Sequence, residues 1–466
     1  EKRHFTQKNN LKKKSNIYGK LFSVIESISE YDRERVLKEF NGKMDSKRLQ
    51  AAETYLYEKL MESLRGFHSK KSIAIQLNRL VLEAQILMSK GLYNLAIKEF
   101  SRAEKLARKH EKRAILLEII PQKGNAIVAL NERNFQEDIE KVYGNLFEEM
   151  EVLEQEIQYR YRNISLIAAF RASSTSSTIE KYYQDTVSKE FPVNGSFYSK
   201  YYYYSIQSIY LFMKKDYKNA AIYQRRVVDI WDGEEVATIK EANIQLYITQ
   251  LANLVSCLNR SEEPDKAWII IEKMADVETS SFDEAGELFQ NVYFLKQSYY
   301  LNKHDLKSSS ELIPAIMNGL DKYSNKINVS RKLSFMYNMS ITKWLLGKNL
   351  EAYKMLNELS KILKYNNHRS DIQRFLPYVQ LAIIYRIKEI DELENKMRSI
   401  KRKQRERNPL ENLILLLFKG LSQAVPGSKT EKMHFRNFRN EINSRKNEYN
   451  VFIGFEEYSI WINSIK

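Results

Sequence analysis

Side chains that commonly catalyse reactions or bind metal ions are few and scattered in this sequence. The chain has one cysteine, Cys257, and six histidines: His4, His68, His110, His304, His368 and His434. Their spacing matches no zinc-binding pattern, and the sequence contains no phosphate-binding loop, dinucleotide fingerprint or nucleophile elbow. Glutamate pairs are plentiful, but the exposed faces of helices carry such pairs in any case. We therefore predict no enzymatic activity, no metal site and no cofactor.

Two further features that look reactive have structural explanations. Asp229, Asp232 and Gly233 lie close together in "DIWDGEE". Their spacing does not fit the twelve-residue calcium loop, so we interpret the stretch as a helix end followed by a turn. Cys257 lies in the apolar run "LANLVSCL", where a buried thiol packs as a small hydrophobic residue. A single cysteine forms no disulfide within the chain, so no oxidising compartment is implied.

Positive charge is the strongest compositional feature. The 466-residue chain has a formal net charge of +16, and much of the excess lies at 1–14, "EKRHFTQKNNLKKK", and at 396–407, "KMRSIKRKQRER". Five basic residues in the second segment are candidates for neutralising phosphates with a steep dependence on salt: Lys401, Arg402, Lys403, Arg405 and Arg407. No aromatic residues alternate with them, which argues against a surface for stacking single strands. We predict a solvated connector here, with contact to nucleic acid as the alternative.

The stretch "FYSKYYYYSIQSIY", residues 197–210, is rich in tyrosine. Tyrosine side chains provide rigid contact area for recognition and for packing alike. Four consecutive tyrosines on a helix point to all of its sides, so some of them face neither the partner helix nor the next pair of helices. The stretch is therefore a candidate binding surface, and packing between pairs of helices is the alternative.

The elements that position these residues are predicted to be helices. Only seven prolines and 14 glycines interrupt the chain, which favours helices joined by short turns. In "KGLYNLAIKEFSRAEKL", residues 90–106, three side chains share one helical stripe: Ala96, Phe100 and Ala103. Gly91 can end the preceding helix in the left-handed conformation, Tyr93 can fill the turn, and Ala84 on that preceding helix is placed to face Ala96. The spacing predicts an antiparallel helical hairpin.

The same offsets recur further along the chain. They fall on Ser208, Tyr217, Ala220 and Val227; on Ser340, Gly347, Ala352, Leu356 and Leu359; and, more weakly, on Ala126, Phe135 and Val142. Partial copies surround Ala267 and Ser309. The positions Ala220, Ala267, Ser309 and Ala352 give a period of 42 to 47 residues.

These residues resemble the tetratricopeptide repeat family. The sequence departs from the family in its longer period, since the usual repeat has about 34 residues, and in lacking most of the prolines that close each repeat. The resemblance covers residues 75–395 and implies an all-α fold, an α-solenoid of antiparallel helical hairpins. We expect a basic tail and helical cap at 1–74, and a basic connector with a helical cap at 396–466, because a stack must cover its exposed ends. Near the end, "YNVFIGFEEY" has strand character, and we predict a loop followed by a helix.

The resemblance also implies binding of a protein or peptide. Ligands of the family usually dock on the first helix of each hairpin, along the concave face. Carried over to this sequence, that groove is lined by Tyr202, Ser205, Ile209, Asn291, Phe294, Tyr337 and Trp344. We expect a non-enzymatic adaptor or scaffold, and the basic charge favours an acidic partner segment. The alternative is a nucleic-acid-associated accessory or regulatory protein that binds through its basic terminal segments, with the groove aromatics serving only in packing.

The sequence gives little information about the cellular location of the protein. No apolar run approaches the roughly eighteen residues of a membrane-spanning helix, and the longest, "LILLLF" at 413–418, fits a core helix. We expect no membrane span and a cytoplasmic protein. The first residue is Glu1 rather than Met. This start is compatible with three alternatives: removal of a leader, a trimmed amino end, or membership of a longer protein. The abundance of Lys, Asn, Ile and Tyr is compatible with the AT-rich coding sequence of a bacterium.

Overall fold

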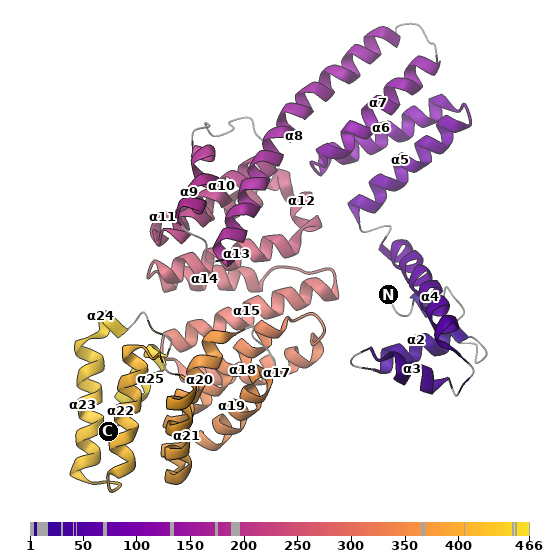
Figure 1. Ribbon diagram of the computed structural model, residues 1–466. Helices are drawn as coiled ribbons and strands as arrows, with labels where there is room; N and C mark the ends of the chain where they lie inside the picture. Colours follow the sequence, from indigo (N-terminus) through magenta and orange to yellow (C-terminus); the bar gives the residue numbers. More distant parts are fainter. Residues whose placement is uncertain are drawn as a thin grey trace. The chain divides into compact units, whose positions relative to one another are not determined.

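Helices account for all the regular structure that is described. The computed structural model describes residues 4–6, 17–28, 31–40, 42, 44–68, 72–130, 135–172, 176–187, 196–364, 369–404, 406–449, 452 and 454–465. Within these ranges no strand occurs (Figure 1), which confirms the expected all-α class. The chain divides into two units, which are described separately: unit 1 is Glu1–Ile206 with Asp232–Ala242, and unit 2 is Gln207–Trp231 with Asn243–Lys466.

Unit 1 contains the following helices: α2 (Ile17–Ser27), α3 (Arg33–Glu39), α4 (Ser46–His68), α5 (Ile73–Ser89), α6 (Tyr93–Lys109), α7 (Arg113–Leu130), α8 (Phe135–Arg171), α9 (Ser176–Val187), the first part of α10 (Phe197–Met213), the short 3-10 helix η1 (Glu234–Val236) and α12 (Ala237–Ala242). Helices α2 to α4 bury a small core around Leu21, Val36 and Leu49. A second core joins α5, α6 and α7 around Ala96 and Phe100.

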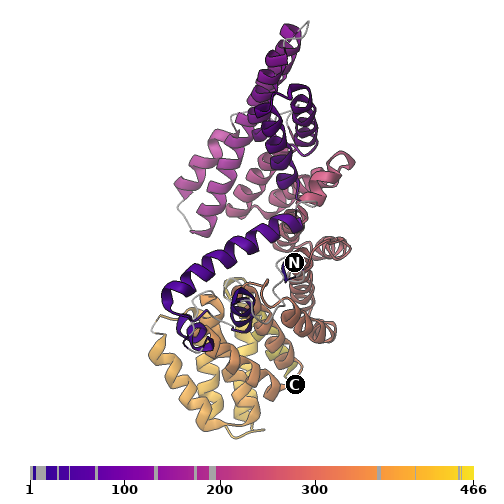
Figure 2. The ribbon, with the colours of Figure 1, turned by 90° about the vertical axis from the view of Figure 1, so that its right-hand side faces the viewer.

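Unit 2 contains the rest of α10 and these helices: α11 (Tyr217–Trp231), α13 (Ile244–Arg260), α14 (Pro264–Ala275), α15 (Phe282–Asn302), α16 (Leu306–Glu311), α17 (Ile313–Lys322), α18 (Val329–Leu345), α19 (Asn349–Lys364), α20 (Ser370–Ile387), α21 (Ile390–Lys403), α22 (Pro409–Gln423), α23 (Lys429–Ser444), α24 (Lys446–Tyr449) and α25 (Phe455–Ser464). Consecutive helices pack on each other from α13 to α15 and from α18 to α23. In the side view the orange and yellow helices of this unit form one group (Figure 2).

One turn conformation recurs between consecutive helices. Two residues before the second helix of a pair, the backbone takes a left-handed conformation at Gly91, Glu111, Lys215, Glu262, His304, Gly347 and Lys388. The next N–H then returns to a carbonyl of the first helix: Leu92 donates to Leu87 at 3.0 Å, and Asp216 donates to Leu211 at 2.9 Å. This Schellman arrangement satisfies carbonyls that the helix end leaves free. Within unit 2 the left-handed residues lie 47, 42, 43 and 41 positions apart.

A fully buried side chain follows each of these turns. Five residues after the left-handed position the exposed fraction is 0% at Ala96, Leu116, Ala220, Ala267, Ser309, Ala352 and Leu393. The small side chains in this set let two helices approach closely, as the sequence spacing predicted. In one pair the Ser208 hydroxyl donates to the carbonyl of Ala220 at 3.2 Å across the interface. The same turn and the same buried position thus recur in both units.

Several local predictions can be compared with the described residues. Cys257 is buried, and burial raises the pKa of its thiol to about 11, so it is a packing residue. The "DIWDGEE" stretch is a helix end and turn as predicted, because α11 ends at Trp231 and Gly233 precedes η1. Around "YNVFIGFEEY", α24 ends at Tyr449 and α25 starts at Phe455. Residues 396–403, predicted to begin a connector, belong to α21, so the expected boundary at 395 falls inside a helix.

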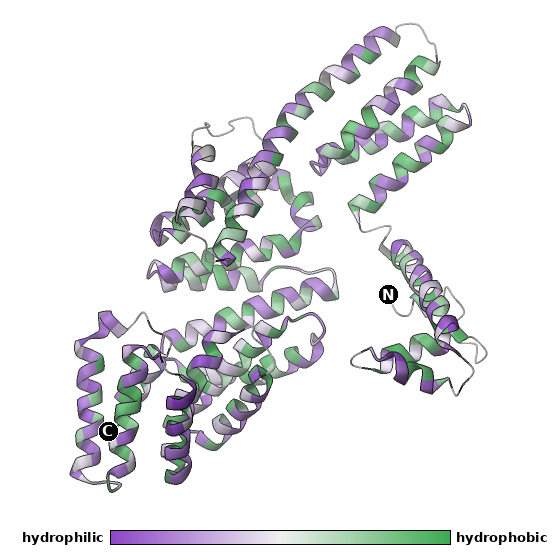
Figure 3. Ribbon diagram, viewed as in Figure 1, coloured by the Kyte–Doolittle hydropathy of each residue, from purple (hydrophilic) through white to green (hydrophobic). Residues whose placement is uncertain are grey.

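Hydropathy varies sharply among the helices of unit 2. Helix α21 is largely hydrophilic and α22 largely apolar (Figure 3). Leu393, Met397 and Ile400 form the buried stripe of α21, and its remaining faces carry charged residues. None of the described helices has the length and apolar character needed to cross a membrane.

Candidate functional site

Helix α25 packs against α18 and α23 through one apolar face. Its sequence, "FEEYSIWINS", places Phe455, Tyr458, Trp461 and Ile462 on that face, and all four are buried. Helical periodicity brings these positions to one side. The carbonyl of Ile462 accepts a hydrogen bond of 2.9 Å from Arg439 of α23, which caps the end of α25.

Aromatic rings hold α25 on α18. The ring of Trp344 lies 5.7 Å from that of Tyr458 and 5.8 Å from that of Trp461, measured between centroids. Tyr458 also donates a hydrogen bond of 2.6 Å from its hydroxyl to the carbonyl of Tyr378 on α20. Rings at these separations contribute about 0.5–1.5 kcal/mol per pair beyond the burial of their surface. The side of α18 that carries Trp344 is therefore covered by a helix of the same chain.

A polar contact accompanies these rings. The Tyr337 hydroxyl of α18 donates to a carboxylate oxygen of Glu457 at 3.2 Å. Burial raises the pKa of the Glu457 carboxyl, the neighbouring charge of Glu456 raises it further, and the hydrogen bond from Tyr337 opposes the rise. The carboxyl group therefore takes up a proton more readily here than in water.

Gly454 allows the chain to enter α25. Its φ of 88° lies in the left-handed region, and a Cβ atom added there would lie 1.7 Å from Cζ of Phe375. Only glycine combines this backbone conformation with such a close approach. The ring of Phe375 in turn contacts Tyr458, with 6.0 Å between centroids. Gly454 and Phe375 together fix where α25 begins.

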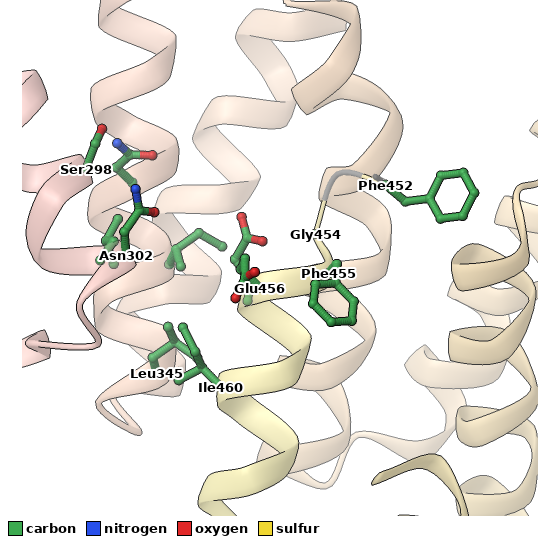
Figure 4. Close-up of a pocket in the computed structure, with 12 residues that line it drawn as sticks. Ser298, Asn302, Leu345, Phe452, Gly454, Phe455, Glu456 and Ile460 are labelled. Carbon is green, nitrogen blue, oxygen red and sulfur yellow. The ribbon is translucent and has the colours of Figure 1, made fainter. Parts of the chain in front are cut away.

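A pocket of about 310 Å³ lies where the start of α25 meets α15 and α18 (Figure 4). Its polar lining consists of Ser298, Asn302, Asn338, Glu456 and Glu457, and its apolar lining includes Leu301, Ile341, Leu345 and Ile460. In the close-up, Ser298 and Asn302 lie on one side, while Glu456 and Ile460 belong to α25 on the other.

The polar lining of this pocket offers hydrogen-bond donors, hydrogen-bond acceptors and negative charge. An asparagine amide offers a donor and an acceptor, which match the N–H and C=O of a peptide unit, and the two carboxylates accept from N–H groups or attract a cation. The described residues that line the pocket include no histidine, cysteine or lysine. We call this pocket, with the adjacent side of α18, the α15–α18 site.

The residues predicted to line a groove lie in both units. Tyr202 and Ser205 belong to unit 1 and Ile209 to unit 2, although all three lie on α10. In unit 2, Tyr337 and Trp344 come together under α25. The structure therefore buries Tyr337 and Trp344 beneath a helix of the same chain, and neither lines the pocket.

Asn291 and Phe294 occupy other environments on α15. The Asn291 amide is buried and donates to the carbonyl and the carboxylate of Glu287, at 2.9 Å and 2.8 Å. The ring of Phe294 packs edge-on against Phe335, and the Arg331 guanidinium lies 4.1 Å from its centroid. The Asn291 amide and the Phe294 ring therefore make their contacts with residues of the same unit.

The predicted basic cluster is divided between solvent and internal contacts. Lys401, Arg402 and Lys403 are exposed at the end of α21. Arg407 donates to the side chain of Asn412 at 3.0 Å. Arg405 lies outside the described residues.

Sequence reasoning missed most of the α15–α18 site. Ser298, Asn302 and Asn338 stand singly in helices, and nothing in their spacing marks them as a set. Glu456 and Glu457 lie in the "GFEEY" stretch, where an acidic first turn is typical of any helix. The apolar spacing of Phe455, Tyr458 and Trp461 was a usable signal. It predicts that one face of α25 is buried, but it does not identify the helix that covers this face.

Comparisons with known proteins add no relative. No protein-family model matches the chain, and no match was found among the curated proteins. In the described part of the chain, His, Cys, Asp and Glu side chains form no group of three or more that could hold a metal ion.

Proposed function

We propose that this protein is a non-enzymatic adaptor that binds a segment of a partner protein on the first helices of a tetratricopeptide-like helical array. The left-handed turns at 41- to 47-residue intervals support the array, because the same supersecondary unit is repeated. The observation that carries the proposal is the pocket of about 310 Å³ between α15, α18 and the start of α25, since α25 itself covers the Trp344 side of α18.

The lining of the α15–α18 site favours one kind of partner. Asn302 and Asn338 are suited to a peptide backbone, and Glu456 and Glu457 to a lysine, an arginine or an N–H donor. An acidic partner segment, which the net charge favours, would be repelled by these two carboxylates. We therefore propose a partner segment that is amphipathic and carries at least one basic side chain.

The test is affinity purification from the native cell lysate, with and without nuclease, followed by mass spectrometry. The bait proteins are the unmodified chain, the Asn302→Ala/Asn338→Ala variant, and an Asn395→Ala control at an exposed position of α21. We expect a protein that survives nuclease, is retained by the control and is lost from the double variant.

A partner retained equally by all three baits would contradict the proposal. Recovery only of nucleic acid, or only of proteins that nuclease releases, would move the function to the exposed basic residues Lys401 and Arg402. Circular dichroism of each variant verifies that the helices are intact.

A further inference from the structure

A second pocket lies between α19, α20 and α21, away from the α15–α18 site. Its volume is about 770 Å³, within the range of roughly 300–1,000 Å³ typical of small-molecule sites. Its lining combines serine, glutamine, lysine and arginine side chains with apolar surface from Leu363, Leu376 and Ile400. No aromatic ring lines it among the described residues.

Helix α21 contributes two cations to this pocket. Lys396, Ser399, Ile400 and Lys403 all line it, and their spacing of i, i+3, i+4 and i+7 puts them on one helix face. Neither lysine forms a hydrogen bond or a salt bridge with a described residue. Lys396 is half-buried, and burial together with the charge of Lys403 lowers the pKa of its ammonium group, against the opposing effect of Glu392. An anion between the two ammonium groups would relieve their repulsion.

The other charged groups nearby are already paired or, like the exposed Lys364 that also lines the pocket, lie at the edge. Arg374 forms a two-pronged contact with the buried carboxylate of Glu411, at 2.6 Å and 2.8 Å. Glu392 accepts a hydrogen bond from the Tyr353 hydroxyl. Glu406 is exposed and lines the pocket, where it is the one carboxylate in the described lining. The two lysines therefore remain the groups best placed to receive an anion.

Helix α20 contributes acceptors on a second wall of the pocket. Gln380 is 1% exposed, and its Nε2 donates to Oδ1 of Asn357 at 2.7 Å. Its Oε1 is buried and accepts no hydrogen bond from the described residues. Pro377 has no N–H, so the carbonyl of Gln373 lacks its normal helical donor, and both residues line the pocket. A buried acceptor without a donor is unfavourable until a ligand supplies one.

We propose that this pocket binds a small phosphorylated polyol, such as a hexose phosphate, with its phosphate between Lys396 and Lys403 and its hydroxyl groups donating to Gln380 Oε1 and the Gln373 carbonyl. The long lysine side chains can converge on one phosphate. A ligand with both an anion and several hydroxyls fits donors on one wall and acceptors on the other. The lack of an aromatic platform among the described lining residues disfavours a nucleotide, because bases usually stack on such rings.

Isothermal titration calorimetry of the full chain tests the proposal. The probes are glucose 6-phosphate, glucose and inorganic phosphate, and the variants are Lys396→Met, Lys403→Met and Gln380→Met. Lys401→Met is the matched control, because Lys401 is an exposed lysine of the same helix that does not line the pocket. Circular dichroism and the melting temperature verify that each variant folds. Because Lys403 is exposed, we expect Lys403→Met to fold like the unmodified chain.

We expect saturable binding of glucose 6-phosphate, weaker binding of inorganic phosphate and none of glucose. Each lysine variant should weaken glucose 6-phosphate binding by about tenfold or more, as expected for a charge-assisted hydrogen bond. Gln380→Met should weaken glucose 6-phosphate binding but leave inorganic phosphate unaffected. Absence of saturable binding, an equal loss in Lys401→Met, or equal binding of glucose would each overturn the proposal.

Discussion

The hydroxyl of Tyr337 donates a hydrogen bond to the carboxylate of Glu457, which lies 120 residues further along the chain. This contact joins α18 to α25 at the edge of a pocket that also contains Asn338 and Glu456. The stability of the packing of α25 on α18 therefore depends on the protonation of the half-buried Glu457 carboxyl group.

The docking of α25 should weaken as pH rises. The pKa of Glu457 is raised in the folded state, so the folded protein binds the proton more tightly than the unfolded chain does. Stability from this group is therefore full below the unfolded pKa of about 4.3 and is lost as pH rises through the folded value. Glu457→Gln removes this titration, keeps an acceptor for Tyr337 and should raise the melting temperature at pH 7. Thermal unfolding, followed by tryptophan fluorescence from pH 4 to 8, measures the effect; an unchanged pH profile in the variant would contradict it.

Replacing Gly454 should disturb the start of α25. Gly454→Ala should destabilise the protein for two reasons. The left-handed backbone disfavours an L side chain by about 1–2 kcal/mol, and the added Cβ would clash with the ring of Phe375. Gly427→Ala is the matched control, because Gly427 has a φ of 80° and no atom within 4 Å of its added Cβ. We expect a larger loss of unfolding free energy at Gly454 than at Gly427 in urea denaturation. Equal losses would mean that the clash with Phe375 does not change the free energy of unfolding.

Removing an unpaired buried amide should stabilise unit 2. Gln297 of α15 is fully buried, and neither Nε2 nor Oε1 has a hydrogen-bond partner among the described residues. Gln297→Met keeps the length of the side chain and removes both polar atoms, so we expect a gain of about 1–3 kcal/mol in unfolding free energy. Gln50→Met, at an exposed position of α4, should change stability by no more than about 0.5 kcal/mol. A loss of stability in Gln297→Met would show that the amide is paired in solution.

In unit 1, Arg113 compensates buried negative charge. Its guanidinium contacts Glu156 at 2.8 Å and Glu111 at 3.0 Å, and the side chain of Glu156 is only 10% exposed. Arg113→Ala should destabilise by about 3–5 kcal/mol, because Glu156 would remain buried without a cation. Arg102→Ala breaks an exposed pair with Glu99 and should cost less than about 1 kcal/mol. Adding Glu156→Gln to Arg113→Ala should recover much of the loss, and failure to do so would assign the effect to packing.

The sequence was sufficient to predict the helical class and two of the turns, because apolar periodicity and glycine are local signals. Gly91 and Gly347 marked their turns in this way. The turns at Lys215, Glu262 and His304 have the same left-handed conformation without the glycine that usually signals it, so residue type did not mark them in the sequence.

The candidate site was much harder to predict. Tyr337 and Trp344 could be assigned to the first helix of a hairpin, but their burial under α25 depends on residues more than a hundred positions away. Helical periodicity shows which face of a helix is apolar and does not show its partner. The same limit applies to Gln380, whose Nε2 donates to Asn357 on a neighbouring helix while its Oε1 accepts no hydrogen bond from the described residues.

The packing of α25 on α18 also bears on the order in which unit 2 folds. The repeated turns join helices that are adjacent in sequence, so those contacts close short loops and form quickly. The Tyr337 to Glu457 contact must close a loop of 120 residues, which has a larger entropic cost. We therefore expect α25 to dock after the hairpins have formed and to detach before they unfold. Amide hydrogens of α25 should accordingly exchange with solvent sooner than those of the buried helix α20.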